Sequence, residues 1–360
     1  MVIMLVVEED PVDKILDEEE LDLERQEEES EEEPALPNDS DVECELGVDQ
    51  LKGIGAVTKK KLETFGVTSL VDLCVRGSQE IKEITGVAKP TCDSWVFQSQ
   101  KLLEEHGFIR KSDMNTTELW EYQKAYPVIK TKCDEIDNLI SGGVRPEATY
   151  EVYGEFGAGK TQFCNSLTVE TINEGGNVIW IDCEDTFKPN RIVEILKARE
   201  YAEDDEEASS YLNNITYLYC PNTEQLMGTI NGLSKILSEK KPKLVIIDGA
   251  IGQFREEYLG RGTLAERQMQ IARLMSHIKN ISFYFRCAVV FTNQVQSDPS
   301  MMFGDPIKPI GGNVVAHAST YRLYFKKSGK KRLARMIDSP EHAMADAEYI
   351  LNEKGMDNAE

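Results

Sequence analysis

The stretch GEFGAGKTQF, which begins at Gly154, limits the fold more than any other part of the 360-residue chain. It matches G-x-x-x-x-G-K-[ST], with Gly154, Gly159, Lys160 and Thr161 at the fixed positions. A strand-like apolar segment precedes this match, and a segment of helical length follows it. In that setting consecutive loop N–H groups and a helix N-terminus both face phosphates. The stretch therefore predicts an α/β domain that binds a nucleotide.

Further short apolar segments predict the rest of the sheet. The expected strands cover 149–154, 177–182, 215–220, 243–249, 287–295, 320–327 and 331–338. Amphipathic stretches separate the earlier strands, which is typical of a mostly parallel sheet with helices on both faces. The last two strands lie close together around Ser328 and Gly329, so we expect an antiparallel hairpin at the end of the sheet. The predicted core spans residues 128–360.

Negative charge is concentrated in a predicted tail, residues 1–47. This segment holds 20 Asp and Glu against two basic residues and carries −18 of the net −24. Such a run repels itself and buries little apolar surface, so we expect it to be disordered. Because the rest of the chain carries only −6, the acidic composition does not argue against nucleic-acid binding by the body. A solubilising role and a regulatory role for the tail both remain open.

Residues 48–105 predict a small all-α domain of the helix-hairpin-helix kind. LKGIGAVTKKKLETFG joins two short helices by a tight glycine turn, and a similar turn recurs at Gly86. In such domains the turn N–H groups and nearby lysines, here Lys59 to Lys61, meet phosphates without reading base sequence. A helical adaptor that binds no DNA is the alternative. Residues 106–127 are expected to form a linker that contains a helix.

Acidic side chains at strand ends predict the chemistry. Asp248 follows four apolar residues, at the strand end where ligands bind in open α/β sheets. We assign Asp248 and the Thr161 hydroxyl to a Mg²⁺ site, and Lys160 to neutralising phosphate charge. Hydrolysis also needs a group that orients the attacking water. In IDCED the residue pattern alone leaves Glu184 and Asp185 open for that task.

The first candidate DNA segment is 252–268. Its arginines and intervening glycines are Arg255, Arg261, Arg267, Gly260 and Gly262. Glycines favour a mobile loop and arginines meet phosphates, although a solvated helix start would also give this pattern.

The second candidate DNA segment, 296–313, is long and is expected to lack regular structure, as functional loops often do. Met301, Met302 and Phe303 could wedge against bases, or serve as a hydrophobic lid or subunit contact.

Five stretches resemble the archaeal RadA recombinases, of the RecA-like strand-exchange family. They are VYGEFGAGKTQ, IDCEDTFKPNRI, FREEYLGRGTLAERQ, TNQVQSDPSMMFGDPIKPIGGNVVAHAST and RLARMIDSP, and the resemblance covers roughly residues 48–357. It implies a RecA-like P-loop ATPase core that uses ATP and Mg²⁺. The implied partners are single- and double-stranded DNA and further copies of the chain, in a filament or ring. The implied activity is DNA-dependent ATP hydrolysis coupled to strand exchange in repair and recombination; a paralogue that regulates filaments is the alternative.

The resemblance also assigns residues. It selects Glu184 for water activation, with Lys160 and Gln294 as the other catalytic residues. The implied nucleotide-binding residues are Gly154, Glu155, Phe156, Gly157, Ala158, Gly159, Lys160, Thr161, Gln162, Arg191, Asp338 and Pro340, of which the last two reach the neighbouring subunit's ATP. The implied DNA-binding residues are Arg255, Tyr258, Arg261, Gly262, Arg267, Lys308, Gly311 and Gly312. Thr161 and Asp248 remain the expected metal ligands.

The linker departs from the family pattern. The family polymerises through an F-x-x-A hook in this region, whereas the nearest string here, Phe108 to Lys111, has Lys in place of Ala. An ungapped register would instead place Asp113 to Thr116 there, with no Phe. The sequence therefore leaves open which residues make the polymer contact.

The remaining composition favours a cytoplasmic protein without a membrane segment. No stretch approaches the roughly 20 apolar residues of a membrane span. The eight cysteines form no C-x-x-C pair, so buried or inert thiols in a reducing compartment are expected.

Overall fold

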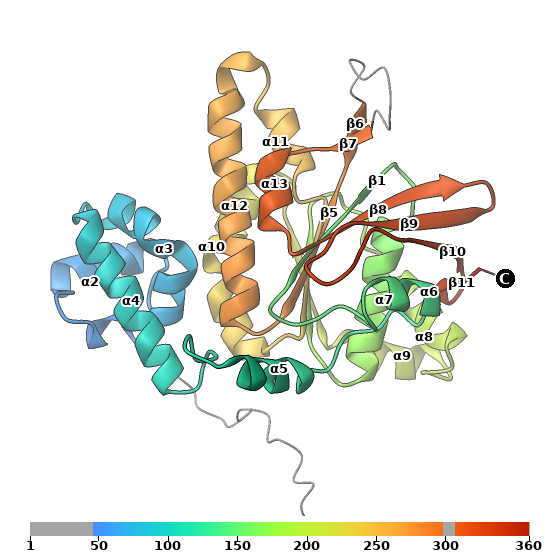
Figure 1. The fold of residues 1–360 in the computed structure, drawn as a ribbon, viewed down its shortest axis with the longest axis horizontal. Helices are drawn as coiled ribbons and strands as arrows, with labels where there is room; N and C mark the ends of the chain where they lie inside the picture. Colours follow the sequence, from blue (N-terminus) through green and yellow to red (C-terminus); the bar gives the residue numbers. More distant parts are fainter. Residues whose placement is uncertain (1–45, 298–306, 360) are drawn as a thin grey trace, which may run out of the picture.

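The computed structural model describes residues 46–297 and 307–359, which form a helical N-terminal module beside an α/β core (Figure 1). The module lies next to the long helices α10 (Thr223–Lys240) and α12 (Leu264–Tyr284), and the sheet lies on their other side. Nearly all of the predicted acidic tail falls outside the described residues. Its last two residues belong to the module, since Leu46 is buried and Gly47 bridges to Ser69.

The predicted α/β fold with a mostly parallel sheet is confirmed. The strands are β1 (Thr149–Gly154), β2 (Val178–Asp182), β3 (Ile215–Tyr219), β4 (Leu244–Asp248), β5 (Ala288–Asn293), β8 (Tyr321–Ser328), β9 (Lys331–Asp338), β10 (Asp346–Asn352) and β11 (Gly355–Asn358). Their order in the described sheet is β11-β10-β9-β8-β1-β5-β4-β2-β3. From β8 to β3 all neighbours run parallel, which brings the carboxyl ends of these strands to one edge.

The predicted hairpin around Ser328 is also present, because β8 pairs with β9 in antiparallel fashion. It does not end the sheet, however, and that part of the prediction is wrong. β10 and β11 add two further antiparallel strands. Their sequence signal is weak because only Ala347 and Tyr349 alternate as buried residues along β10.

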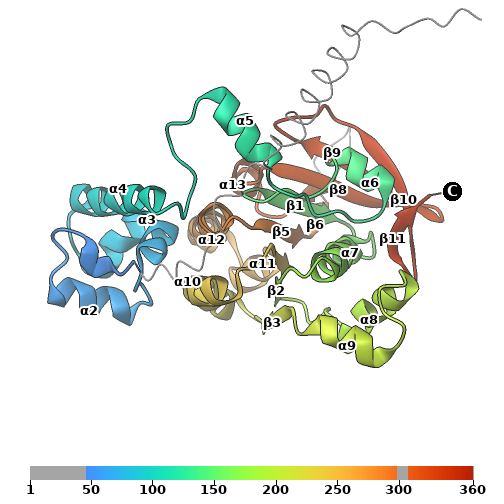
Figure 2. The same cartoon turned by 90° about the horizontal axis from the view of Figure 1, so that it is seen from below.

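Helices cover both faces of the sheet, as the burial of β4 shows. Val245 and Ile247 pack toward α10 and α12, whereas Leu244 and Ile246 pack toward the helix that carries Phe163. The helices on that second side are α6 (Asp134–Leu139), α7 (Lys160–Asn173), α8 (Pro189–Ala198) and α9 (Asp205–Leu212). Every residue of β4 is buried, as expected for a parallel strand covered on both sides. Figure 2 shows the strands between the two groups of helices.

The module contains η1 (Val48–Gln50), α2 (Ala56–Thr64), α3 (Leu70–Thr85) and α4 (Lys89–Glu105). Ser69 starts α3 with a capping box to Asp72, and Gly86 ends it in the left-handed conformation. Gly77 kinks α3 at φ 73° and ψ 162° and so divides it into two helical parts. The helix-hairpin-helix assignment stays a prediction.

Two of the three lysines expected to meet phosphates contact the module itself. The Lys59 ammonium lies 3.1 Å from a carboxylate oxygen of Asp49. The Lys61 ammonium donates to the carbonyl oxygen of Thr85 at 2.8 Å. A phosphate would therefore compete with these internal partners, and contact with DNA through the lysines remains a prediction.

A buried polar cluster fixes the module to the core. Glu80 on α3 accepts hydrogen bonds from Arg76 on the same helix and, at 2.8 Å, from His277 on α12. Arg76 also donates to the carbonyl oxygen of Asn231 on α10. Asn280 on α12 donates to the carbonyl oxygen of Val75 at 2.9 Å. The module is thus held by specific polar contacts with both long helices.

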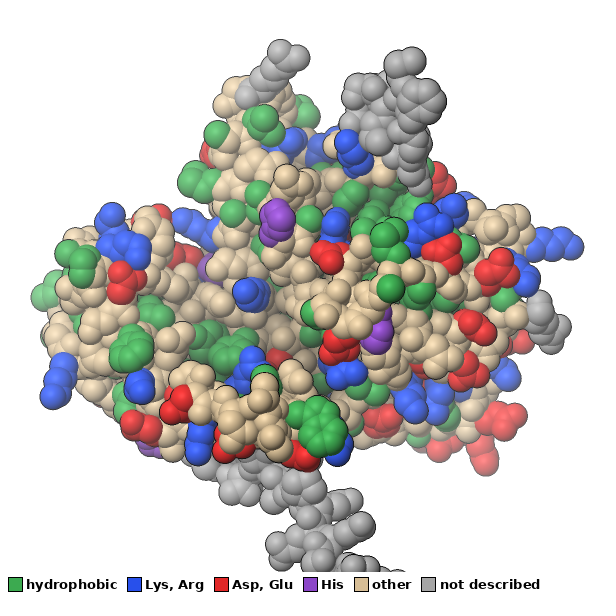
Figure 3. Space-filling model, viewed as in Figure 1, with side chains coloured by type: hydrophobic (Ala, Val, Ile, Leu, Met, Phe, Trp, Pro, Cys, Tyr) green, Lys and Arg blue, Asp and Glu red, His purple; other side chains and the backbone are tan. Residues whose placement is uncertain are grey.

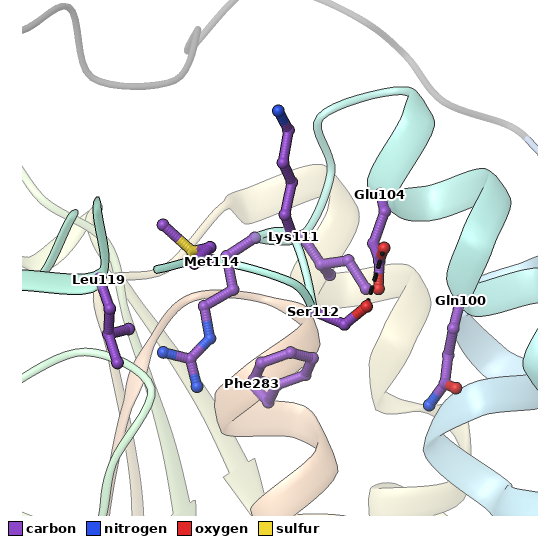
Figure 4. Close-up of a pocket in the computed structure, with 9 residues that line it drawn as sticks. Gln100, Glu104, Lys111, Ser112, Met114, Leu119 and Phe283 are labelled. Atoms are coloured by element: carbon purple, nitrogen blue, oxygen red, sulfur yellow. Dashed lines mark hydrogen bonds between the residues drawn. The ribbon is translucent and has the colours of Figure 1, made fainter. Parts of the chain in front are cut away.

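The linker contains α5 (Thr116–Lys124) and borders a cavity of about 370 Å³ at the junction with the core (Figure 4). Ser112 donates to Glu104 across this cavity at 3.3 Å, and Phe283 of α12 forms part of its wall. The Phe108 ring makes a T-shaped contact with the Phe285 ring, and Ile109 is buried. The Phe of the F-x-x-A-like string is therefore used in internal packing.

The cysteines of the described residues match the expectation from composition. The seven described cysteines are all buried free thiols. None of the described helices combines the length and apolar character needed to cross a membrane.

Candidate nucleotide and DNA site

The predicted phosphate loop lies at the carboxyl end of β1. Gly154 pairs with Phe325 of β8, and a Cβ at Gly154 would lie 2.0 Å from the Phe325 carbonyl oxygen. Gly157 and Gly159 adopt φ values of 73° and 111°, which L side chains rarely do. Helix α7 starts directly afterwards at Lys160. The loop therefore combines a glycine backbone with a helix N-terminus, the arrangement that binds phosphate.

Lys160 closes the loop from inside. Its ammonium donates to the carbonyl oxygens of Gly154 at 2.9 Å and Glu155 at 3.2 Å. Burial lowers the pKa of Lys160, while the charges of Glu184 and Asp248 act in the opposite direction. The Lys160 ammonium therefore lies at the phosphate loop. On nucleotide binding, phosphate oxygens would replace these two carbonyl oxygens as its hydrogen-bond acceptors.

Three residues that the sequence analysis missed support the loop. Tyr349 of β10 donates its hydroxyl to the Ala158 carbonyl oxygen at 2.7 Å. The Lys327 ammonium would lie 2.9 Å from a Cβ at Gly157, and Arg332 lies beside Gly159. These side chains come from β8 to β10, more than 150 residues after the loop, and no local motif marks them.

The Asp248 carboxylate is surrounded by three threonine hydroxyls. It accepts hydrogen bonds from Thr161 and Thr186 at 3.0 Å each, and from Thr292. Burial raises the pKa of Asp248, and the three hydroxyls counteract that effect. Thr186 and Thr292 were not predicted, because a single Thr carries no pattern.

These oxygens fit a hard divalent cation. Mg²⁺ at nucleotide sites takes one or two carboxylates together with phosphate oxygens and waters. The Asp248 carboxylate and the Thr161 hydroxyl lie together at the start of α7, next to the phosphate loop. A cluster of three or more acidic, Cys or His ligands is absent from the described residues, and such a Mg²⁺ site does not require one.

The structure separates the roles of the three acidic residues that follow β2. Asp182 is fully buried and accepts backbone N–H groups of Glu184, Thr186 and Phe187, so it shapes the turn. Asp185 has a positive φ of 56°, is exposed and pairs with Lys188. Glu184 alone of the three lines a cavity at the strand ends.

That cavity, of about 230 Å³, is lined by Cys183, Glu184, Gly249, Gly252, Gln253, Glu256 and Gln294. Gln294 donates its side-chain amide to Glu184 at 2.8 Å, and a Cβ at Gly249 would lie 2.5 Å from the Glu184 Cγ. Burial raises the pKa of Glu184; the Gln294 hydrogen bond lowers it and the Asp248 charge raises it further. The site thus holds a carboxylate suited to accept a proton from water.

The first candidate DNA segment is more ordered than expected. Residues 252–257 form α11 (Gly252–Glu257), η2 (Arg261–Thr263) follows, and α12 begins at Leu264. The prediction of a mobile loop is wrong for α11, because Gly252, Gln253 and Phe254 are buried under the strand ends.

The predicted DNA-binding residues of this segment differ in exposure. Arg255 is exposed, Tyr258 is half-buried and stacks on Phe254, and Gly262 is exposed with open space around it. Arg267 is half-buried on α12, and the Arg261 side chain is not among the described ones. DNA contact by these five residues remains a prediction.

The second candidate segment has a structured base. β6 (Val295–Ser297) and β7 (Ile307–Pro309) form a short antiparallel hairpin, so the expectation of an irregular segment is wrong at both ends. The backbone N–H of Ile310 donates to the Gln294 carbonyl oxygen at 3.1 Å. Met301, Met302 and Phe303 lie outside the described residues. The hairpin begins at Val295, immediately after Gln294, whose side chain contacts Glu184.

Lys308 is exposed on β7, and two glycines complete the turn into α13 (Asn313–Ala318). The backbone at Gly311 is closely packed. A Cβ there would lie 2.4 Å from a methyl carbon of Val315 and 3.4 Å from a methyl carbon of Ile251, the residue before α11. Gly312 precedes α13 with a positive φ. Figure 3 shows Lys and Arg side chains gathered at this upper edge of the core. Both candidate segments thus meet at one end of the sheet.

Comparison with known proteins identifies the family. The Rad51 family model matches residues 123–359. The chain belongs to the Rad51 family. A protein of Cenarchaeum symbiosum named DNA repair and recombination protein RadA is 42% identical over 317 residues, covering 86% of this chain and 78% of that protein. A protein of the same name from Methanoculleus marisnigri is 33% identical over 324 residues, covering 87% of this chain and 98% of that protein. The resemblance to RadA recombinases is therefore confirmed.

The remaining predicted nucleotide-binding residues lie within the part of the chain that the Rad51 family model matches. Arg191 donates to Gln162 at 3.0 Å and to backbone carbonyls of the β10–β11 turn, so it connects α8 with α7 and that turn. Asp338 at the end of β9 and Pro340 are exposed. A role of these four residues toward ATP remains a prediction.

Proposed function

We propose that this Rad51-family chain is an ATP-dependent recombinase of DNA repair and recombination. It forms a filament on single-stranded DNA and pairs that strand with a homologous duplex. The hydrogen bond from Gln294 to Glu184 carries the proposal, because it joins the group suited to activate water to the base of the second DNA segment. The RadA relatives, named for DNA repair and recombination, support the same activity.

The geometry of the phosphate loop and of Glu184 supports ATP hydrolysis. The phosphate loop and Lys160 would hold the β- and γ-phosphates, and Glu184 would take the proton of the attacking water. Asp248 and Thr161 would hold Mg²⁺, which neutralises phosphate charge when bound. Because Gln294 contacts Glu184, loss of the terminal phosphate would change the surroundings of Gln294, which directly precedes the hairpin of the second DNA segment.

Self-assembly has a candidate surface on β3. Among the described strands, β3 has a sheet neighbour on only one side, namely β2. Tyr217 and Tyr219 on this strand are 42% and 51% exposed. A strand at the edge of a sheet that carries exposed aromatic side chains suits addition of a strand from another subunit.

A strand-exchange assay tests the proposal. Purified chain, ATP and Mg²⁺ are mixed with circular single-stranded DNA and a homologous linear duplex, and joint molecules are measured on gels. We expect homology-dependent joint molecules, and none from Lys160→Ala, which lacks the phosphate-binding cation. A wild-type chain that binds DNA and hydrolyses ATP without joint molecules would be a filament regulator, and the proposal would be wrong.

A further inference from the structure

Gln253, at the start of α11, makes contacts that neither the phosphate site nor DNA contact explains. Its side chain is 7% exposed and lies between the ends of two strands. The amide nitrogen donates to the carbonyl oxygen of Cys183 at 2.9 Å and to that of Cys220 at 2.6 Å. Since only the N–H₂ end can face two carbonyls, these partners also fix the orientation of the amide.

The two carbonyls belong to the segments that continue β2 and β3. Cys183 immediately precedes Glu184, and its N–H is bonded to the Asp248 carbonyl oxygen at 2.9 Å. Gln253 therefore holds the backbone on which the catalytic side chain is mounted, at the wall of the cavity that Glu184 lines.

Helix α11 belongs to the first candidate DNA segment and lies next to Gln294, shortly before the second. Gly252 lies under Gln294, with 3.4 Å between its Cβ position and the Gln294 amide nitrogen. At the other end of α11, Glu257 accepts the backbone N–H of Thr223 at 2.8 Å, so the helix is held at both ends. Between them Arg255 is exposed to solvent. A displacement of α11 by DNA would thus be transmitted to the Cys183 carbonyl.

The second polar atom of the amide argues against a purely structural role. The Oε1 of Gln253 is buried and has no hydrogen-bond partner among the described residues. An unpartnered buried carbonyl disfavours folding, so this side chain is not the best choice for stability alone.

We propose that Gln253 is the positioning residue that couples the first DNA segment to Glu184, so that DNA contact at α11 sets the rate of ATP hydrolysis. The inference rests on the proposed function, since it requires DNA-stimulated hydrolysis.

The test compares steady-state ATP hydrolysis with and without single-stranded DNA. In Gln253→Met, which keeps the size of the side chain and removes both donors, we expect the ratio of the two rates to fall about tenfold, within the usual range of couplings. The KM for ATP should change less than about twofold, because the phosphate loop is untouched. Gln225→Met on α10, where the side chain is exposed, is the matched control and should keep the wild-type ratio.

Gln253→Glu provides a second variant in case Gln253→Met folds poorly. Near neutral pH its carboxylate would face two carbonyl oxygens and the stimulation should be lost. Burial raises the pKa of a carboxyl in that place, so at about pH 5.5 its O–H donates to one carbonyl oxygen. The stimulation ratio of the variant, divided by that of wild type at the same pH, should then be at least about twofold higher than near neutral pH.

The outcomes are distinguishable. A wild-type chain whose hydrolysis does not respond to DNA would overturn the proposed function. A stimulated wild type with an unchanged ratio in both Gln253 variants would overturn the coupling role, even if their melting temperatures fall, because a structural residue changes stability alone.

Discussion

At the residue scale, three neighbouring carboxylates acquire different roles from their surroundings. Asp182 accepts three backbone N–H groups, Asp185 pairs with an exposed lysine, and Glu184 lies in a cavity beside an amide donor. Their spacing in the sequence could not separate these roles, because each depends on where the turn after β2 points its side chains. Family resemblance selected Glu184, and the geometry favours the same residue.

Glu184→Gln should retain ATP binding and lose hydrolysis by about 100-fold or more, since general-base groups contribute about 10²–10⁴. Single-turnover hydrolysis and equilibrium binding of a fluorescent ATP analogue separate the two properties. Asp185→Asn is the matched control and should hydrolyse ATP at nearly the wild-type rate. Near-normal hydrolysis by Glu184→Gln would show that another group accepts the proton of the attacking water.

Gln294→Ala should move the acidic limb of the pH–rate profile to higher pH. The carboxylate of Glu184 must be unprotonated to act as a base, and burial already raises its pKa above 4.5. The Gln294 hydrogen bond opposes this rise, so its removal raises the pKa further and activity is lost at a higher pH. An acidic limb that stays in place would show that Gln294 does not act on the ionisation of Glu184.

At the element scale, the parallel strands were predictable and the connections were not. β4 reads as LVIID, an apolar run ending in a carboxylate, and its bounds lie within one residue of those expected. Helix α11 was read as a mobile loop because Gly260 and Gly262 follow it, although its buried Gly252 and Phe254 hold it under the sheet. The 3-residue strands β6 and β7 are too short to show a periodicity.

Gly249→Ala should displace Glu184 while leaving ATP bound. Its Cβ would lie 2.5–2.9 Å from three atoms of the Glu184 side chain, and its φ of 84° adds roughly 1–2 kcal/mol of backbone strain. We expect hydrolysis to fall at least about tenfold with a lower melting temperature, measured by a coupled ATPase assay and calorimetry. Gly228→Ala in α10, where a Cβ meets nothing within 4 Å, should raise stability by about 0.5–1 kcal/mol and keep activity. Equal effects of the two substitutions would contradict this account.

At the scale of the whole molecule, the module and the core are joined by charge as well as by apolar packing. Glu80 is surrounded by Arg76, His277 and Arg273. Burial alone would raise the pKa of Glu80, but the His277 hydrogen bond and the charges of His277 and Arg76 hold it below 4.5. This contact could not be predicted, because its partners lie about 200 residues apart.

Glu80→Gln should weaken docking of the module by about 3 kcal/mol, since it leaves the buried Arg76 guanidinium without its counter-charge. Calorimetry should then resolve a separate, earlier transition for the module, and the linker should become more sensitive to protease. Glu83→Gln on the same helix removes a partly exposed pair and should cost less than about 1 kcal/mol.

The pH dependence has a definite sign. Because the pKa of Glu80 is lowered in the folded chain, its contribution is complete above 4.5 and is lost as the pH falls through the folded value. Wild type should therefore show the early module transition in acid. A module transition that is independent of pH would exclude Glu80 as the source.

The one-sided edge at β3 has a consequence for how the chain behaves in concentrated solution. In the proposed assembly, this sheet edge and its exposed tyrosines would attract other copies, whereas the −18 charge of residues 1–47 would repel them. Added salt screens the repulsion over about 10 Å at 0.1 M and leaves the strand contact largely intact. Ionic strength would therefore act in opposite senses on the two proposed assemblies: it would promote association of the protein with itself and weaken association with DNA.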